Sequence, residues 1–318
     1  SLVAMCHSQR SGGEDVDIRP FLGPWASNAT KLEELNSLFN SASPFPHVVI
    51  ENLFEYSFAR IIESKFPIPR GEAPKEWISQ GWHVYDNPIE GKLAQDNVEA
   101  MGKHDPAFQT LWQILQSDQM VDLVKRITGI PNLEKDPHLH GAGLHYHPRG
   151  SRLEMHLDYS IHPITGKERR VNLIVYMNGG WEAAWGGDLH LWEGSLEAMR
   201  LFAVRVAPRF NTAALFRTSD ESWHGMPDPV ACPEGLARKS VAIYYVSDPR
   251  PDATRRLKAA FRPRPGHPHP LSDAGDAEEA DSAYLQLCRL RDSRLLHIDD
   301  LRLHAPTWSA RWGAGDAA

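Results

Sequence analysis

The hydrophobic pattern of the first part of the chain is mainly helical. Apolar residues recur at helical spacing through "ATKLEELNSLFN", which predicts a helix over residues 29–40. The apolar run "HVVIENL" then predicts a strand over 47–53. Similar amphipathic spacing predicts three more helices, at 55–66, 106–116 and 118–130.

From about residue 139 the pattern changes to short β-like segments separated by turn residues. They include "LHYHP", "RLEMHLDYSI", "RVNLIVYMN", "GGDLHLWEG", "AVRVAP", "TAALFRT" and "KSVAIYYVSD". Strands at this density, with turn signals between them, favour a β-sandwich or a jelly-roll barrel. We therefore expect a mainly β core over about 139–248, flanked by helices in an α+β arrangement.

This pattern divides the chain into three parts. Residues 1–45 form a lead-in and a helix, 46–250 form the main domain, and 251–318 form a tail. Within the tail, Pro-rich 262–270 and acidic 273–281 resemble linkers, and 282–296 is a possible helix. The long aromatic segment 80–94 is expected to be a loop that shapes substrate entry.

Charge and composition narrow the class of protein. The net charge of -7 and the pI near 6.1 argue against a nucleic-acid partner, since no basic field attracts phosphates. The 3 cysteines are scattered, which indicates a reducing compartment and no structural zinc. No apolar run is long enough to span a bilayer. We expect a soluble, cytoplasmic protein with no membrane partner.

One short motif suggests a metal site. "HLD" places His156 and Asp158 two residues apart, and the turn-rich segment after "TAALF" supplies His224. Two histidines and one carboxylate commonly hold iron(II) on one face of an octahedron and leave three positions open. Downstream, Arg238 begins a buried-looking strand, where a guanidinium could bind a carboxylate.

The ordered set of motifs resembles the Fe(II)/2-oxoglutarate-dependent dioxygenases, specifically their prolyl-4-hydroxylase-like branch. That branch carries HxD, a Y-L-N strand end, GG-x-L, a distal His and an Arg that opens the last barrel strand. The corresponding features here are "HLD" at 156–158, "YMN" at 176–178, "GGDL" at 186–189, His224 and Arg238. The resemblance spans about residues 140–248 and implies a double-stranded β-helix (jelly roll).

The resemblance also implies a role for individual residues. His156, Asp158 and His224 would bind Fe(II), and Arg238 would pair with the far carboxylate of 2-oxoglutarate, with Arg217 or Lys239 as alternatives. Further cosubstrate contacts would come from Tyr146, Tyr176 and Ser240. The implied reaction consumes O2 and 2-oxoglutarate, releases succinate and CO2, and hydroxylates an organic substrate. The carboxylate of Asp158 favours hydroxylation, because halogenating relatives have a small residue at this position.

Other polar and aromatic residues are weaker candidates. His145 and His147 alternate on one predicted strand and could act together as metal ligands. The nearest acid, Glu154, lies too far along the chain for the cupin pattern of HxH followed by Glu. Trp185 and Arg170 could contact substrate, although a solvated strand end is the more ordinary interpretation of Arg169 and Arg170.

Three classes of function stay open at this point. We expect a dioxygenase that hydroxylates a small-molecule or peptide substrate: a protein prolyl residue, a free amino acid or a small metabolite. The alternatives are a non-catalytic jelly-roll binding protein and a cupin-type metal enzyme that does not use 2-oxoglutarate. Intact His156, Asp158, His224 and Arg238 argue against both. The sequence leaves the oligomeric state undetermined.

Overall fold

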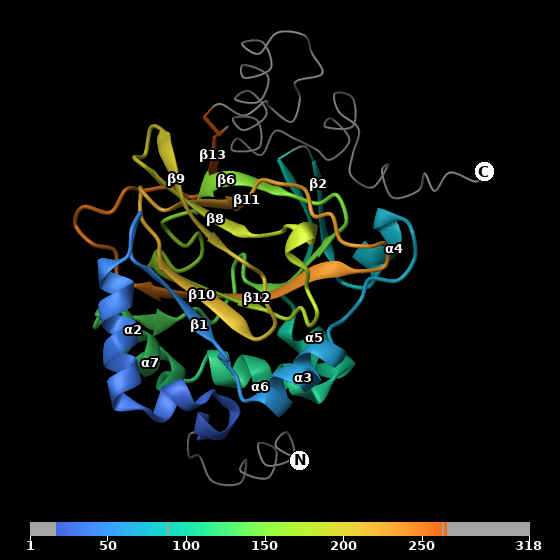
Figure 1. Cartoon of the computed structure of the whole chain (residues 1–318), viewed down its shortest axis with the longest axis horizontal. Coiled ribbons are helices and arrows are strands. Elements are labelled where there is room, and N and C mark those ends of the chain that lie inside the picture. The colour runs from blue at the N-terminus through green and yellow to red at the C-terminus, as the bar shows by residue number, and fades with distance from the viewer. Residues whose placement is uncertain (1–16, 88, 263, 266–318) are drawn as a thin grey trace.

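A computed structural model describes residues 17–87, 89–262 and 264–265 of the chain (Figure 1). The chain enters through two short 3-10 helices, η1 (Arg19–Phe21) and η2 (Pro24–Ser27). Helix α2 (Ala29–Ser41) follows, and the side chain of its N-cap residue Asn28 accepts a hydrogen bond from the Lys31 backbone N–H at 3.0 Å. The helix predicted at 29–40 is therefore confirmed.

A large antiparallel sheet forms the centre of the molecule. Its strand order is β1-β10-β7-β12-β5-β3-β6-β11-β8-β9, and it bends at the junction of β3 and β6, which share one residue pair, Glu90 with Leu153. We call the strands before this junction the first half and those after it the second half. The first half contains β1 (His47–Glu51), β3 (Glu90–Gln95), β5 (Gly143–Pro148), β7 (Glu168–Tyr176), β10 (Thr212–Arg217) and β12 (Ala237–Ser247).

The second half is smaller and is extended by short strands. It contains β6 (Leu153–Leu157), β8 (Leu189–Gly194), β9 (Met199–Val206) and β11 (Trp223–Met226). Strand β13 (Ala260–Phe261) pairs with β6, while β2 (His83–Asn87) and β4 (Glu134–Lys135) pair with β3 and β12 of the first half. The result is a nearly closed antiparallel sandwich, which confirms the predicted jelly-roll core with flanking helices.

Helices cover the outer face of the first half. Figure 1 shows α2, α3 (Tyr56–Ser64), α5 (Val98–His104), α6 (Pro106–Leu115) and α7 (Asp118–Thr128) gathered on this side. Alternate residues of β12 point to opposite faces. Val241, Ile243 and Tyr245 pack in the core with the helices, and the Tyr245 hydroxyl donates to the Leu115 carbonyl of α6 at 2.9 Å. The intervening residues of β12 line a cavity between the two halves.

Two segments differ from the predictions. The expected loop at 80–94 is a β-hairpin of β2 and β3, preceded by helix α4 (Pro74–Ser79). The start of the expected tail is ordered, because residues 254–262 pack against β6 and β13 joins the sheet. The expected helix at 282–296 and the acidic segment at 273–281 lie outside the described residues. No helix in the described ranges is both long and apolar enough to cross a membrane.

Candidate active site

Three metal-ligating side chains meet at the inner face of the second half. His156 lies near the end of β6, Asp158 follows that strand, and His224 lies on β11 directly opposite His156. Their ligand atoms lie within 4.8 Å of one another, and all three residues are buried. Residues two apart on an extended chain face the same side, which brings His156 and Asp158 together. Within the described part of the chain this is the one such cluster.

Backbone hydrogen bonds orient both imidazoles. His156 Nδ1 lies 2.9 Å from the Glu154 carbonyl, and His224 Nδ1 lies 2.8 Å from the Ser222 carbonyl. A carbonyl accepts only, so each Nδ1 carries the proton and donates it. The lone pair of each Nε2 is left facing Asp158, at 3.7 Å and 3.3 Å from its carboxylate oxygens. Such outer hydrogen bonds fix the tautomer that a metal-binding histidine needs.

The protonation states suit a divalent cation. Burial, with a smaller contribution from His224, lowers the pKa of His156 to about 3, so this imidazole is neutral at physiological pH. Burial would raise the pKa of Asp158, but the positive charge of Arg169 and the contact with His224 hold it well below its usual range. Neutral imidazole and ionised carboxylate are the forms that bind metals.

Asp158 is held by two side chains from β7. Asn172 Nδ2 donates to its Oδ2 at 2.7 Å, and Arg169 Nη2 lies 3.0 Å from the same oxygen. Arg169 is itself fixed by a hydrogen bond from Nε to Asn172 Oδ1 at 2.8 Å and by the ring of Tyr244, 3.2 Å from its guanidinium carbon. The ordinary interpretation of Arg169 as part of a solvated strand end is wrong, because this side chain is buried against a metal-binding carboxylate.

A glycine lets the strand that carries His224 approach β6. A Cβ at Gly225 would lie 2.8 Å from the Leu153 carbonyl oxygen and 2.9 Å from that of Glu154. The pairing of β11 with β6 also shifts register between His224 and Met226, which marks a bulge. Any larger residue at Gly225 would push His224 away from the other two ligands.

Arg238 lies on the facing half of the sheet, at the start of β12. Its Nε donates to the Gly187 carbonyl at 2.7 Å, and its guanidinium carbon lies 4.8 Å from the centre of the Tyr176 ring. Gly187 has φ +78°, and a Cβ there would lie 3.1 Å from Arg238 Cδ. Burial lowers the pKa of Arg238, yet an arginine stays charged at neutral pH. None of the described carboxylates lies within ion-pairing distance of it.

Other buried polar atoms accompany this cation. Ser240 lies two residues further along β12 and lines the same cavity, and its Oγ has no hydrogen-bond partner in the described part of the chain. The Tyr176 hydroxyl is likewise buried beside Arg238 without a hydrogen bond of normal geometry. A buried cation next to buried hydroxyl groups is an environment that suits an anion. Without a bound anion, the cation and the hydroxyl groups would all lose their contact with water and gain no partner in return.

Strand alternation separates Tyr146 from this environment. Tyr146 packs in the hydrophobic core and its ring lies 6.1 Å from that of Trp82. Its neighbours His145 and His147 line the cavity instead. The predicted cosubstrate contact Tyr146 therefore lies on the face of β5 that packs in the core. The two histidines next to it in sequence lie on the face that lines the cavity.

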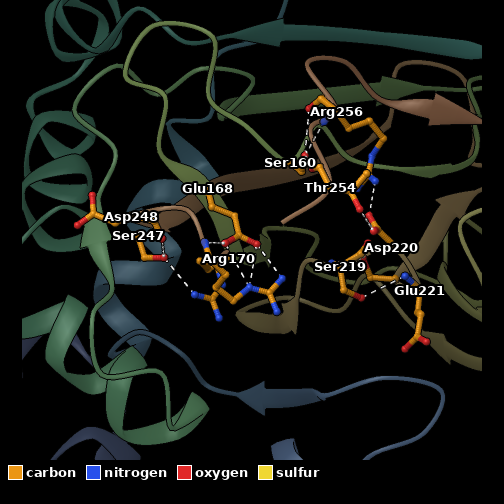
Figure 2. A network of polar contacts seen from close by, with 12 residues as sticks. Ser160, Glu168, Arg170, Ser219, Asp220, Glu221, Ser247, Asp248, Thr254 and Arg256 are labelled. Carbon is orange, nitrogen blue, oxygen red and sulfur yellow. Dashed lines mark hydrogen bonds and ion pairs between the residues drawn. The ribbon is translucent and has the colours of Figure 1, made fainter. Parts of the chain in front are cut away.

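Two predicted substrate contacts also lie away from the cavity. Trp185 ends the short helix η3 (Ala183–Trp185), packs edge-on against Trp181 at 5.3 Å and does not line the cavity. Arg170 is buried on the opposite side of β7 from Arg169, and its Nη1 donates to Ser247 Oγ at 3.1 Å (Figure 2). The register of β12 against β7 shifts at this point, so Arg170 is the extra residue of a bulge.

The start of the tail covers the metal ligands. Phe261 stacks on His156, with ring centres 4.9 Å apart and planes inclined by 21°. Arg256 donates from Nε to the Asp158 carbonyl at 2.8 Å. It also forms an ion pair with Asp220, which Figure 2 shows. These two residues carry no motif. The signal that could have revealed Arg169 is the pair of arginines inside the apolar strand "ERRVNLIVY", since a buried arginine requires a partner.

The cavity between the two halves has a volume of about 420 Å³ and contains all three metal-ligating residues. Arg238, Ser240 and His147 line it from the first half, and Phe261 closes it from the tail. The donor set of two imidazoles and one carboxylate fits Fe(II), and the buried unpaired cation fits the carboxylate of a keto acid. The residues present therefore fit both iron and 2-oxoglutarate.

Residues 142–246 match the family described as the 2OG-Fe(II) oxygenase superfamily. No curated protein matches the sequence. This region contains the two strands that carry the triad and the strand that carries Arg238, so the match and the geometry concern the same part of the molecule.

Several solved structures are similar in outline. A prolyl hydroxylase from Trichoplax adhaerens, in complex with a hypoxia-inducible factor peptide fragment, is 18% identical, with 71% of this chain and 94% of that chain covered and a TM-score of 0.46. A prolyl 4-hydroxylase from Phytophthora capsici is also 18% identical, with coverage of 86% and 88% and a TM-score of 0.45. HygX from Streptomyces hygroscopicus, with nickel and 2-oxoglutarate bound, is 15% identical, with coverage of 67% and 86% and a TM-score of 0.43.

Fe(II) and 2-oxoglutarate are the cofactors typical of the matched family, and the buried triad supplies the iron ligands. Residues 142–246 therefore form a region that matches the 2OG-Fe(II) oxygenase superfamily and carries a buried triad of two histidines and one aspartate.

Proposed function

We propose that this protein hydroxylates a C–H bond of an organic substrate and converts 2-oxoglutarate and O2 to succinate and CO2. The observation that carries the proposal is the buried triad of His156, Asp158 and His224 opposite a buried Arg238 that has no described carboxylate partner. Iron and 2-oxoglutarate, when bound, supply the oxidising chemistry.

The protein's residues would hold and orient these groups. His156 and His224 would hold the metal through Nε2, and Asp158 would hold it through its carboxylate, at the wall of the cavity. Arg238 would bind the far carboxylate of 2-oxoglutarate in a bidentate pair, and Ser240 would donate its hydroxyl. Asn172 and Arg169 hold Asp158 in place through its Oδ2. The stacked Phe261 excludes water from one face of His156.

The shape of the cavity supports a compact polar substrate. Its outer wall is formed by the β2–β3 hairpin and by residues of the ordered tail, and these segments limit the size of a substrate that can reach the triad. Glu90 and Lys92 form an ion pair at 3.0 Å on this wall, and His83 faces Asp96 at 3.1 Å. Charged groups of both signs favour a free amino acid, a small polar metabolite or a single prolyl residue of a peptide that reaches into the cavity.

The test is substrate-stimulated turnover. Purified protein would be incubated with Fe(II), 2-oxoglutarate and ascorbate, with panels of free amino acids, polar metabolites and prolyl peptides, and succinate would be measured. We expect one panel member to raise succinate release and to gain about 16 Da, the mass of one oxygen atom, with none of this in Asp158→Ala. Succinate release without a mass gain in any substrate, or no release at all with iron bound, would contradict hydroxylation.

A further inference from the structure

His147 is a buried polar side chain that faces the cavity from strand β5. It is 2% exposed, and neither ring nitrogen makes a hydrogen bond of normal geometry in the part of the chain that the structure describes. A neutral imidazole carries one hydrogen-bond donor and one acceptor. Burying both without a partner costs free energy, because their hydrogen bonds to water are lost and not replaced. A buried side chain of this kind indicates that its partner is a ligand rather than the protein.

The neighbours of His147 indicate which ligand. In the antiparallel pairing of β5 with β12, His147 lies directly opposite Arg238, and His145 lies opposite Ser240. His147, Arg238 and Ser240 all line the cavity between the two halves of the sheet. The Ser240 hydroxyl is also without a partner among the described residues. A guanidinium, a hydroxyl and an imidazole therefore surround one end of the cavity.

The chemistry of these three groups matches one carboxylate. An ionised carboxylate has about four lone-pair positions, and a bidentate arginine uses two of them. The remaining positions can accept one bond from a hydroxyl and one from an imidazole N–H. Burial, followed by the charge of Arg238, holds the pKa of His147 well below its usual range, so the ring is neutral and keeps a single donor.

We propose that His147 is a cosubstrate-positioning residue that donates a ring N–H to the far carboxylate of 2-oxoglutarate, beside Arg238 and Ser240. This inference rests on the proposed function, because it requires 2-oxoglutarate to be the occupant of the cavity. It assigns to His147 the role that the sequence suggested for Tyr146, whose side chain lies in the core. His147 lies outside the compact cluster that His156, Asp158 and His224 form within the described residues.

The experiment is an anaerobic titration of Fe(II)-loaded protein with two keto acids. Both 2-oxoglutarate and 2-oxovalerate chelate iron through the keto and near carboxylate oxygens, but 2-oxovalerate has a methyl group where 2-oxoglutarate has its far carboxylate. The charge-transfer absorption of the chelate reports the Kd of each acid without any turnover. The variants are His147→Phe and His147→Gln, and the matched control is Tyr146→Phe.

We expect His147→Phe to weaken 2-oxoglutarate binding about 10-fold or more, since a hydrogen bond to a charged group is lost, and to change 2-oxovalerate binding less than about twofold. His147→Gln keeps a donor and should weaken 2-oxoglutarate less than the phenylalanine does. Tyr146→Phe should leave both Kd values unchanged. If His147→Phe fails to bind iron, His147→Leu, which also lacks a donor, takes its place in the same comparison of the two acids.

The outcomes separate this inference from the proposed function. Equal losses for the two keto acids, or no loss for either, in an iron-binding His147 variant that lacks a donor would overturn the role of His147 and leave the proposed function intact. No charge-transfer band for wild-type protein with either acid would contradict the proposed function itself. A loss confined to substrate-dependent turnover, with both Kd values unchanged, would place His147 on the substrate and refute its contact with the cosubstrate.

Discussion

At the residue scale, the metal centre depends on contacts that sequence motifs do not record. The motif "HLD" and the distal histidine supply the three candidate ligands. Their orientation comes from the Glu154 and Ser222 carbonyls and from Asn172 and Arg169 around Asp158. The sequence could predict the ligands because the motifs are local, but a buried arginine can be assigned a partner only once strands distant in sequence are placed together.

The buried ion pair between Arg169 and Asp158 gives the first prediction. Arg169→Met removes the cation and leaves an uncompensated buried carboxylate, so the free energy of unfolding of the metal-free protein should fall by about 3 kcal/mol. Lys167→Met is the control, because its ion pairs with Glu134 and Asp248 are exposed to solvent and contribute little to stability. Urea denaturation measures both. Equal small losses would show that Arg169 does not stabilise the site.

Glu154 gives a prediction for pH. Burial raises the pKa of this carboxyl from 4.5 to about 7, so the folded state holds the proton more tightly than the unfolded state. Its contribution to stability is therefore complete below pH 4.5 and is lost as pH rises to about 7, with a total of about 3 kcal/mol. The advantage of Glu154→Gln over wild type should grow by this amount between pH 4.5 and 8 in urea denaturation of metal-free protein. A difference that is constant with pH would contradict the shift.

At the element scale, the sequence predicted the jelly-roll strands better than the segments that enclose the cavity. Alternation and turn residues identified the region from 139 to 248, which contains strands β5 to β12 and so most of both halves. The β2–β3 hairpin was expected to be a loop, and residues 254–262 were expected to belong to a tail. Both segments are polar and short. Their conformation depends on pairing with β5 and β6, which local periodicity does not reveal.

The ordered start of the tail can be tested through Arg256. This side chain donates to the Asp158 carbonyl and pairs with Asp220, while the Arg256 backbone N–H donates to Ser160 Oγ at 2.8 Å. Arg256→Met should release this segment, so the amides of β13 and of Arg262 should exchange with deuterium at least about 10-fold faster, since 1.4 kcal/mol corresponds to tenfold. Arg255→Met is the matched control, because Arg255 is exposed. Unchanged exchange in Arg256→Met would show that Arg256 does not anchor the segment.

At the scale of the whole molecule, the active site joins the two halves of the sheet. The triad lies on the second half and Arg238, Ser240 and His147 lie on the first. A ligand that contacts the triad and Arg238 at the same time can do so only in the folded protein, where the two halves of the sheet face each other. The ordered motifs let the family and the triad be predicted from sequence. They did not distinguish Tyr146 from His147, because that choice depends on which face of β5 meets the cavity.

This arrangement predicts ligand-linked stability. Because Fe(II) and 2-oxoglutarate would bind the folded state alone, 2-oxoglutarate at about 100 times its Kd should raise the free energy of unfolding of iron-loaded protein by about 2.7 kcal/mol. Anaerobic thermal or urea denaturation measures the change. Arg238→Met should lose most of the 2-oxoglutarate increment and keep the increment from iron, since Arg238 lies on the half opposite the triad. Loss of both increments would place Arg238 in the metal site instead.

The central claim is that the buried triad and the facing arginine form one site for iron and 2-oxoglutarate. Its most direct test is the charge-transfer absorption of wild-type protein during anaerobic addition of 2-oxoglutarate after Fe(II), compared with Asp158→Ala and Arg238→Met. The account predicts a saturable band in wild type, no band in Asp158→Ala because a metal ligand is missing, and in Arg238→Met a band only at much higher 2-oxoglutarate concentration. Wild-type protein that binds iron but gives no band with 2-oxoglutarate would contradict it.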